Sequence, residues 1–139
     1  MAFFIDASVF IYAAGKEHPY KEPCSEILKL IELHSIQSVI SVEVIQEILH
    51  RSIRIGQKED GIKSSRIAFA IMPVEPLDAG DCVRALELLE LYSVDCRDAF
   101  HAAWMLRRGI TSIISADKHF DRIKGIERID PIEFIASRF

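Results

Sequence analysis

Short apolar runs alternate with longer segments of helical periodicity along the whole chain, and this alternation constrains the fold more than any other feature. The expected strands are 2–5, 38–40, 72–75, 112–115 and, with a weaker pattern, 127–129. Repeated β/α units of this kind pack on a largely parallel sheet. The sequence therefore predicts an α/β fold, a three-layer α/β/α sandwich with a central, mainly parallel sheet.

The longer segments carry the signals that start and end helices. Asp95 is a candidate N-cap, and Gly109 follows two arginines that suit a helix C-terminus. A helical arm over 42–70 is expected to be broken at Gly56 and Gly61. The expected helices are 9–14, 23–34, 42–55, 62–70, 78–92, 95–108 and a last one that begins near Pro131.

Two of these helices are expected to contribute large side chains to the core. In the segment 78–92, the spacing of Val83, Leu86 and Leu89 predicts an inward apolar stripe, with Leu88 beside it. In the segment 95–108, Trp104 is expected to pack in the core.

The composition is that of one ordinary globular domain. The chain has 139 residues, of which 50% are hydrophobic, and a domain of this length buries roughly 68% of its unfolded surface. With no repeat or linker on which to divide it, we expect a single domain over 1–139. No charge-free run of about 20 apolar residues predicts a transmembrane helix. Three cysteines without CxxC spacing argue against a disulfide framework and fit a reducing cytoplasm.

Four acidic residues lie where expected strands and helices meet. They are Asp6 in "FFIDASVFIYA", Glu47 in "SVEVIQEILHR", Asp98 in "VDCRDAFHAAW" and Asp117 in "SIISADKHFDRI". In open α/β sheets, ligands bind at the carboxyl ends of the strands. Two carboxylates about 4 Å apart repel by roughly 4 kcal/mol at an effective dielectric near 20. If the fold brings the acids together, they must recruit a cation such as Mg²⁺ or Mn²⁺, which activates water in metal-dependent nucleases.

Three of the acids also have a purely structural interpretation. Asp6 and Asp117 are each suited to cap the helix that follows. Asp98 falls in the first turn of a helix, where the helix N-terminus stabilises a negative charge. Three neighbouring side chains are candidates to orient these acids or to bind a water ligand, although surface solvation equally explains the last of them. They are Ser8, Ser115 and Asp121.

Glu47 is the least distinct of the four by pattern. Helical periodicity predicts that Glu47 and Glu43 both project away from the apolar arc, toward solvent. An ion pair between Glu47 and Arg51, one turn later, is the ordinary alternative to a functional role. The pattern favours Glu47 over Glu43 only narrowly.

The charge distribution gives a mixed indication for nucleic acid. The formal net charge is −4, which alone argues against a phosphate-binding protein. The segment 50–66, however, carries a local excess of three positive charges, so Arg51, Arg54 and Lys58 are candidate contacts to RNA phosphates. A solvated helix pair of mixed charge explains the same residues equally well.

The five histidines show no HExxH spacing, so a zinc site is not expected.

The four acidic motifs, in this order and over nearly the whole chain, resemble those of the PIN domain family, which includes the VapC-type toxins of bacteria and archaea. The resemblance implies a compact α/β/α fold with a Mg²⁺- or Mn²⁺-dependent ribonuclease site. The four acids of the family fall on Asp6, Glu47, Asp98 and Asp117, so the resemblance selects Glu47 over Glu43. The hydroxyl position of the first motif falls on Ser8, and Ser115 stands where the fourth motif often has threonine.

The resemblance also implies a reaction and partners. The reaction is endonucleolytic cleavage of RNA by metal-activated water. Many members are toxins held inactive by an antitoxin, and many form homodimers, whereas others process ribosomal or messenger RNA. A non-catalytic module that binds a basic peptide in the acidic groove is an alternative from another class. A receiver domain or a haloacid-dehalogenase-like phosphatase fits less well, because "FFIDAS" holds a single acid.

Overall fold

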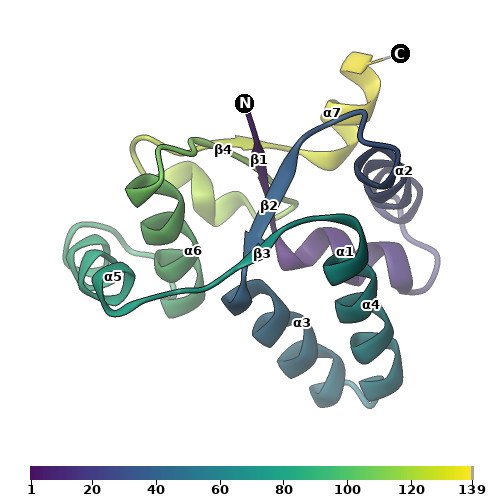
Figure 1. The fold of residues 1–139 in the computed structure, drawn as a ribbon, viewed down its shortest axis with the longest axis horizontal. Coiled ribbons are helices and arrows are strands. Elements are labelled where there is room, and N and C mark those ends of the chain that lie inside the picture. The colour runs from purple at the N-terminus through teal and green to yellow at the C-terminus, as the bar shows by residue number, and fades with distance from the viewer. Residues whose placement is uncertain (139) are drawn as a thin grey trace.

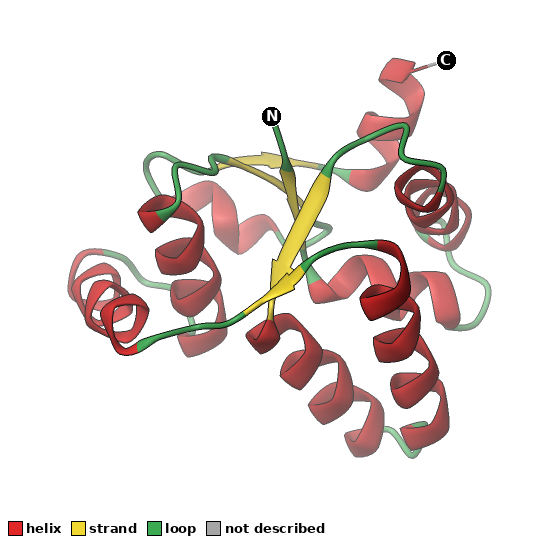
Figure 2. Ribbon diagram, in the orientation of Figure 1, coloured by secondary structure: helices red, strands yellow, loops and turns green. Residues whose placement is uncertain are grey.

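In the computed structural model, which describes residues 1–138, five short strands form one parallel sheet (Figures 1 and 2). The strands are β1 (Phe3–Ile5), β2 (Ser38–Ser41), β3 (Val74–Glu75), β4 (Ser112–Ile114) and β5 (Glu127–Ile129). They lie in the order β3-β2-β1-β4-β5, and each neighbouring pair is parallel. The α/β class predicted from the alternating pattern is confirmed, and all five expected strands are present within one or two residues.

Helices cover both faces of the sheet and complete three layers. They are α1 (Ala7–Ala14), α2 (Lys21–Glu32), α3 (Val42–Arg54), α4 (Lys58–Ile71), α5 (Ala79–Leu91), α6 (Cys96–Arg107) and α7 (Pro131–Arg138), with a 3₁₀ turn, η1 (Lys118–Arg122). In Figure 1, α5 and α6 lie on one side of the sheet, and α1, α2 and α7 lie on the other. The α3–α4 hairpin extends below the sheet in the same view.

The core is built around the central strands. Phe4 and Ile5 of β1 and Ile113 and Ile114 of β4 are fully buried, as parallel strands covered on both faces must be. Trp104 of α6 is buried as expected, and its indole N–H donates to the carbonyl of Pro76 at 2.9 Å. This bond satisfies the one polar group of the largest core side chain.

The strand order places a topological switch point beside β1. From β1 the chain moves to β2 and β3 on one side, and later crosses to β4 and β5 on the other. Loops that leave β1 and β4 therefore diverge at the carboxyl edge, where open α/β sheets bind their ligands. Asp6 directly follows β1, and Ser115 directly follows β4.

The α3–α4 hairpin corrects one prediction about its glycines. Gly56 has φ 74° and ends the first helix as expected. Gly61 does not break the second helix, because α4 begins at Lys58 and continues through it. A β-carbon at Gly61 would lie only 2.5 Å from the Cβ of Ser52, so the glycine permits close packing of α3 against α4.

Helix α5 is rotated relative to the prediction from its apolar spacing. Val83 and Leu86, expected to face inward, are 58% and 59% exposed. The buried residues of α5 are instead Asp81, Ala85 and Leu88. The prediction was wrong for Val83, Leu86 and Leu89, which is 37% exposed, and correct for Leu88. Periodicity cannot foresee a buried carboxylate, and Asp81 makes ion pairs with arginines of the neighbouring helix segment.

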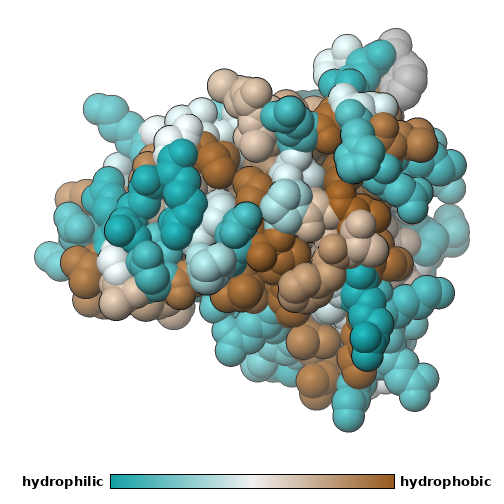
Figure 3. Space-filling model, in the orientation of Figure 1, coloured by the Kyte–Doolittle hydropathy of each residue, from teal (hydrophilic) through white to brown (hydrophobic). Residues whose placement is uncertain are grey.

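The surface differs between the two sides of the view. In Figure 3, apolar side chains gather around β3, hydrophilic and apolar side chains mix over the α3–α4 hairpin, and hydrophilic side chains dominate over α6. Among residues 1–138, no helix combines the length and the apolar character that crossing a bilayer requires.

Candidate metal centre at the carboxyl edge of the sheet

Asp6 occupies the switch point between β1 and α1. It caps α1, because its Oδ2 accepts the backbone N–H of Ser8 at 3.3 Å, and the same oxygen accepts the hydroxyl of Ser115 at 2.8 Å. Its side chain is nevertheless buried with the other acids, and burial followed by the charge of Glu47 raises the pKa of Asp6. The Asp6 carboxylate therefore caps α1, as predicted, and also lies among the other acids.

The two candidate serines join the loop after β1 to the loop after β4. The Ser115 hydroxyl donates to Asp6 and accepts the backbone N–H of Asp117 at 2.9 Å. The Ser8 hydroxyl accepts the backbone N–H of Ala116 at 3.2 Å. These bonds fix Asp6 and Asp117 relative to each other.

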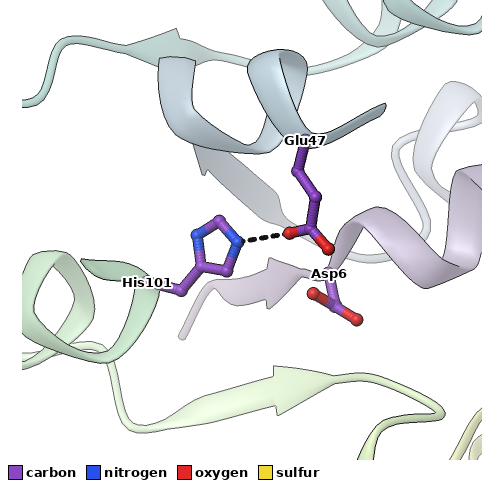
Figure 4. Close-up of side chains that lie close together, drawn as sticks. All are labelled: Asp6, Glu47 and His101. Carbon is purple, nitrogen blue, oxygen red and sulfur yellow. Dashed lines mark hydrogen bonds and ion pairs between the residues drawn. The ribbon is translucent and has the colours of Figure 1, made fainter. Parts of the chain in front are cut away.

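Glu47 lies inside the site, and the prediction that it projects to solvent was wrong. The residue is only 8% exposed, and its carboxylate points toward Asp6 and His101 (Figure 4). The Glu47 Oε1 atom lies 2.8 Å from His101 Nε2, while Oε2 lies 3.4 Å from an Arg51 nitrogen. The expected pair with Arg51 thus forms, but it does not draw Glu47 away from the acids.

Glu43, the competitor to Glu47 by periodicity, has another partner. Its carboxylate lies 3.8 Å from Arg97. Glu43 belongs to neither of the two groups of potential metal ligands described below. The structure therefore separates two glutamates that the helical pattern could not.

His101 is one of two site residues that the sequence analysis missed, and the other is His119. His101 is fully buried, and its ring packs near Phe4 and Phe120. Its Nδ1 has no hydrogen-bond partner within residues 1–138. The available signal was its spacing, because His101 follows Asp98 by three residues and so shares a face of α6 with it.

The environment of Glu47 favours its charged form. Burial raises the pKa of this carboxyl group, but the hydrogen bond and charge of His101, followed by Arg51, outweigh burial and lower it. Glu47 is therefore ionised at neutral pH, and the bond from His101 sets the direction of its carboxylate.

Asp98 is a buried carboxyl group whose charged form has no stabilising partner among residues 1–138. It lies in the first turn of α6, where Asp95 caps the helix by accepting the Asp98 backbone N–H at 3.0 Å. Asp98 is 4% exposed, and its Oδ2 has no hydrogen-bond partner within the described chain. Burial, followed by the charges of Asp117 and Asp95, raises the pKa of Asp98 to about 8. The helix N-terminus alone does not stabilise this carboxylate.

Asp117 follows β4 and caps η1, as expected, by accepting the backbone N–H of His119 at 2.9 Å. The His119 Nδ1 atom lies 3.1 Å from Asp117 Oδ1 and 3.9 Å from Asp98 Oδ2. The loop after β4 thus carries a carboxylate and an imidazole toward α6.

The acids gather as two groups of potential ligands. In each group the ligand atoms lie within 4.8 Å of one another: Asp6, Glu47 and His101 form one, and Asp98, Asp117 and His119 form the other. The two groups interact electrostatically, since the charges of Asp6 and Glu47 contribute to the raised pKa of Asp98. A hard divalent cation fits this donor set of carboxylate oxygens, and the unpartnered Asp98 Oδ2 is the atom that most needs one.

Comparison with known proteins identifies the family. Residues 3–126 match the PIN domain family. The chain belongs to the PIN domain family. Among its relatives, Ribonuclease VapC23 of Mycobacterium tuberculosis is 31% identical over 115 residues, which cover 82% of this chain and 91% of the relative. VapC ribonuclease Mb1869c of Mycobacterium bovis is 30% identical over 131 residues, 90% of this chain and 97% of the relative.

Solved structures share the PIN fold with this chain at lower sequence identity. VapC20 of Mycobacterium tuberculosis, described as a Sarcin-Ricin loop cleaving toxin, superposes with a TM-score of 0.72 at 17% identity over 86% of this chain and 93% of that one. VapBC2 from Rickettsia felis, bound to a DNA fragment from its promoter, gives a TM-score of 0.71 at 18% identity over 94% and 100%.

The remaining candidate residues of this PIN domain lie outside the two ligand groups. Asp121 has a 53% exposed side chain and pairs with Arg128 at 3.0 Å. Arg128 also donates to the Ser115 carbonyl, so Asp121 is linked to the site only through that arginine. Arg54 and Lys58 are exposed at the turn of the α3–α4 hairpin, and of the three candidate RNA contacts only Arg51 touches a site residue.

Proposed function

We propose that this PIN-family chain is a VapC-type toxin that cleaves RNA internally with a divalent metal, Mg²⁺ or Mn²⁺. The observation that carries the proposal is the buried Asp98 oxygen, which has no hydrogen-bond partner among residues 1–138 and lies at a carboxyl edge with three further acids. The names of the relatives, VapC ribonucleases at about 30% identity, support RNA as the substrate.

Four acids would hold the metal. Asp6, Asp98 and Asp117 would bind it directly or through water, and Glu47 would complete the site. A bound divalent ion supplies a water of lowered pKa and neutralises charge on the scissile phosphate. The donor set fits because its oxygens are carboxylates and at least one of them lacks any other partner.

The remaining site residues would position these groups. The hydrogen bond from His101 keeps Glu47 directed at the site, where its ionised carboxylate can orient the attacking water. Ser8 and Ser115 hold the two acid-bearing loops together. Arg51, whose side chain is 47% exposed and pairs with Glu47, would contact a phosphate next to the scissile one.

The test is cleavage of end-labelled RNA under three conditions: with Mg²⁺, with EDTA, and with Mg²⁺ and the variant Asp98→Asn. We expect cleavage only in the first. The variant Asp95→Asn is the matched control, because it changes a neighbouring carboxylate that caps α6 and asparagine also caps helices. Equal cleavage under all three conditions would refute the assignment.

An antitoxin partner is part of the same proposal. Several structural neighbours are toxin–antitoxin complexes, including one from Klebsiella pneumoniae.

Away from the acids, α1, α2 and α4 enclose a hollow of about 420 Å³ whose apolar lining includes Phe10, Leu28 and Ile67. We assign the apolar side chains of an antitoxin to this hollow. Where an adjacent gene encodes a small protein, Ile67→Asp is expected to abolish its binding and to leave RNA cleavage intact, and retained binding would contradict the assignment.

A non-catalytic function is the second candidate, and the same unpartnered oxygen supports it. A guanidinium group from a partner could replace a metal ion among the carboxylates. Calorimetric titration with Mg²⁺ separates the two functions, since a pure binding module takes up no metal at millimolar concentrations.

A further inference from the structure

One of the two groups of potential ligands, that of Asp98 and Asp117, contains an imidazole, and the four-acid site does not account for it. His119 belongs to η1 and follows Asp117 by two residues. Its Nδ1 lies 3.1 Å from Asp117 Oδ1 and 3.9 Å from Asp98 Oδ2, and its backbone N–H donates to that same Asp117 oxygen at 2.9 Å. One carboxylate thus holds both the backbone and the ring of His119 beside Asp98.

A second and independent feature points to a ligand at this place. Asp98 Oδ2 lies in a residue that is only 4% exposed, and nothing within residues 1–138 donates a hydrogen bond to it. The distance of 3.9 Å to His119 Nδ1 is too long for a hydrogen bond. The ligand atoms of Asp98, Asp117 and His119 lie within 4.8 Å of one another, close enough that one divalent ion would accept all three.

We propose that His119 is a ligand side chain of the metal centre and that it shifts the preference of the centre from Mg²⁺ toward first-row transition ions. The proposal rests on the metal-dependent function given above. Mg²⁺ prefers oxygen ligands and keeps several of its waters, so an imidazole adds little to its binding. Affinity of a nitrogen-containing site instead rises from Mn²⁺ through Co²⁺, and imidazole is a common ligand of such ions.

A different role for His119 makes a different prediction. As a fixed positive partner of Asp117, His119 would compete equally with every divalent cation. Its removal would then raise the affinity for all of them by the same factor. As a ligand, its removal must lower the affinity for ions in the order in which they favour nitrogen.

The test uses Mg²⁺, Mn²⁺ and Co²⁺ as probes in calorimetric titrations of the full chain, with the visible absorption of bound Co²⁺ as a second readout that requires no catalysis. His119→Asn places an amide oxygen near the position of Nδ1, and His119→Ala removes the ligand. We expect both variants to lose about tenfold or more in Co²⁺ affinity, less in Mn²⁺ affinity, and less than about twofold in Mg²⁺ affinity. The Co²⁺ spectrum is expected to change accordingly.

His34→Asn is the matched control. His34 is exposed in the turn before β2, at the opposite edge of the sheet, and its φ of 58° is one that asparagine tolerates. The control must keep the affinity ratios of the unchanged protein. Unchanged Co²⁺ to Mg²⁺ ratios in both His119 variants, or a uniform rise in affinity, would overturn the proposal for His119 alone. Full metal affinity in Asp98→Asn would overturn the metal centre itself, so the two failures are distinguishable.

Discussion

Two carboxylates are buried on the paired helices α5 and α6, and their surroundings are opposite. Asp81 of α5 is 0% exposed, and its oxygens accept from Arg107 and Arg108, each at 2.7 Å. Asp98 of α6 is 4% exposed and has an oxygen without any partner among residues 1–138. Burial raises the pKa of Asp81, but its bonds to Arg108, to the Asp78 backbone and to Arg107 outweigh this and bring it to about 2, whereas that of Asp98 rises to about 8.

The difference separates a structural carboxylate from a binding one. Around Asp81 the chain supplies its own cations, Arg107 and Arg108. The guanidinium of Arg108 lies 4.2 Å above the Trp104 ring. Gly80 leaves room for Arg107, because a β-carbon at position 80 would lie 2.6 Å from the guanidinium of Arg107. Around Asp98 the nearest charges are mainly other acids. Ionising a buried carboxyl group without a partner is expensive, so the presence of Asp98 among the other acids indicates that a partner from outside the chain stabilises its charged form.

The largest expected effect comes from removing the unpartnered carboxyl group of Asp98. Asp98→Asn is expected to lower RNA cleavage by about 1000-fold, or about 4 kcal/mol of transition-state stabilisation, without lowering the stability of the metal-free protein. Single-turnover cleavage and urea unfolding measure the two quantities. Cleavage within tenfold of the unchanged protein would place the metal elsewhere.

Removing the charge of Asp81, which is paired with two arginines, is expected to have the reverse outcome. Asp81→Asn leaves Arg107 and Arg108 without their carboxylate and is expected to lower the free energy of unfolding by about 3 kcal/mol, with unchanged cleavage per folded molecule. Asp78→Asn is the control, because Asp78 also contacts Arg107 but has a 62% exposed side chain, so little change is expected. A loss of cleavage in folded Asp81→Asn protein would mean that the two regions are coupled.

The sequence predicts what depends on neighbours along the chain. The strand-end rule and local capping signals are enough to place Asp6 and Asp117 at one edge, and the cap at Asp95 fixes Asp98 in the first turn of α6. The sheet follows from the β/α alternation, because each strand is short and a helix or 3₁₀ turn follows it along the chain.

What the sequence could not predict depends on partners distant in the chain. Glu47 bonds to His101 across 54 positions, and Asp81 bonds to Arg107 across 26. Apolar periodicity treats every charge as outward-facing, so it misdirected Glu47 and turned α5 the wrong way. The family resemblance corrected Glu47 but gave no indication of His101 or of the Asp81 pairs.

His101 tests whether the orientation of Glu47 matters beyond its charge. His101→Ala removes the donor and is expected to lower the cleavage rate by about 10- to 100-fold, as loss of an orienting partner does in metal sites. His101→Gln can still donate to Glu47 and is expected to recover much of the rate. The variants are compared by kcat and KM separately, at a temperature where both are folded. Equal losses in both variants would reduce His101 to a packing role.

The smallest effect concerns the pH dependence of stability in EDTA, and it distinguishes the two carboxylates by its sign. The pKa of Asp98 rises from 3.8 to about 8 on folding, so between these values the folded protein holds a proton that the unfolded chain releases. The free energy of unfolding must therefore fall as pH rises. The full shift corresponds to about 3.5 kcal/mol between about pH 5 and pH 8. Because water and rearranged side chains screen a buried carboxyl group, we expect a smaller loss of about 1 to 2 kcal/mol, which is absent from Asp98→Asn. Asp81, whose pKa falls to about 2 on folding, contributes stability that is present above 3.8 and lost as the pH drops through about 2. Its variant should therefore differ in slope only in acid. Urea unfolding across this pH range measures both, and parallel curves for Asp98→Asn and the unchanged protein would show that Asp98 is ionised without a metal.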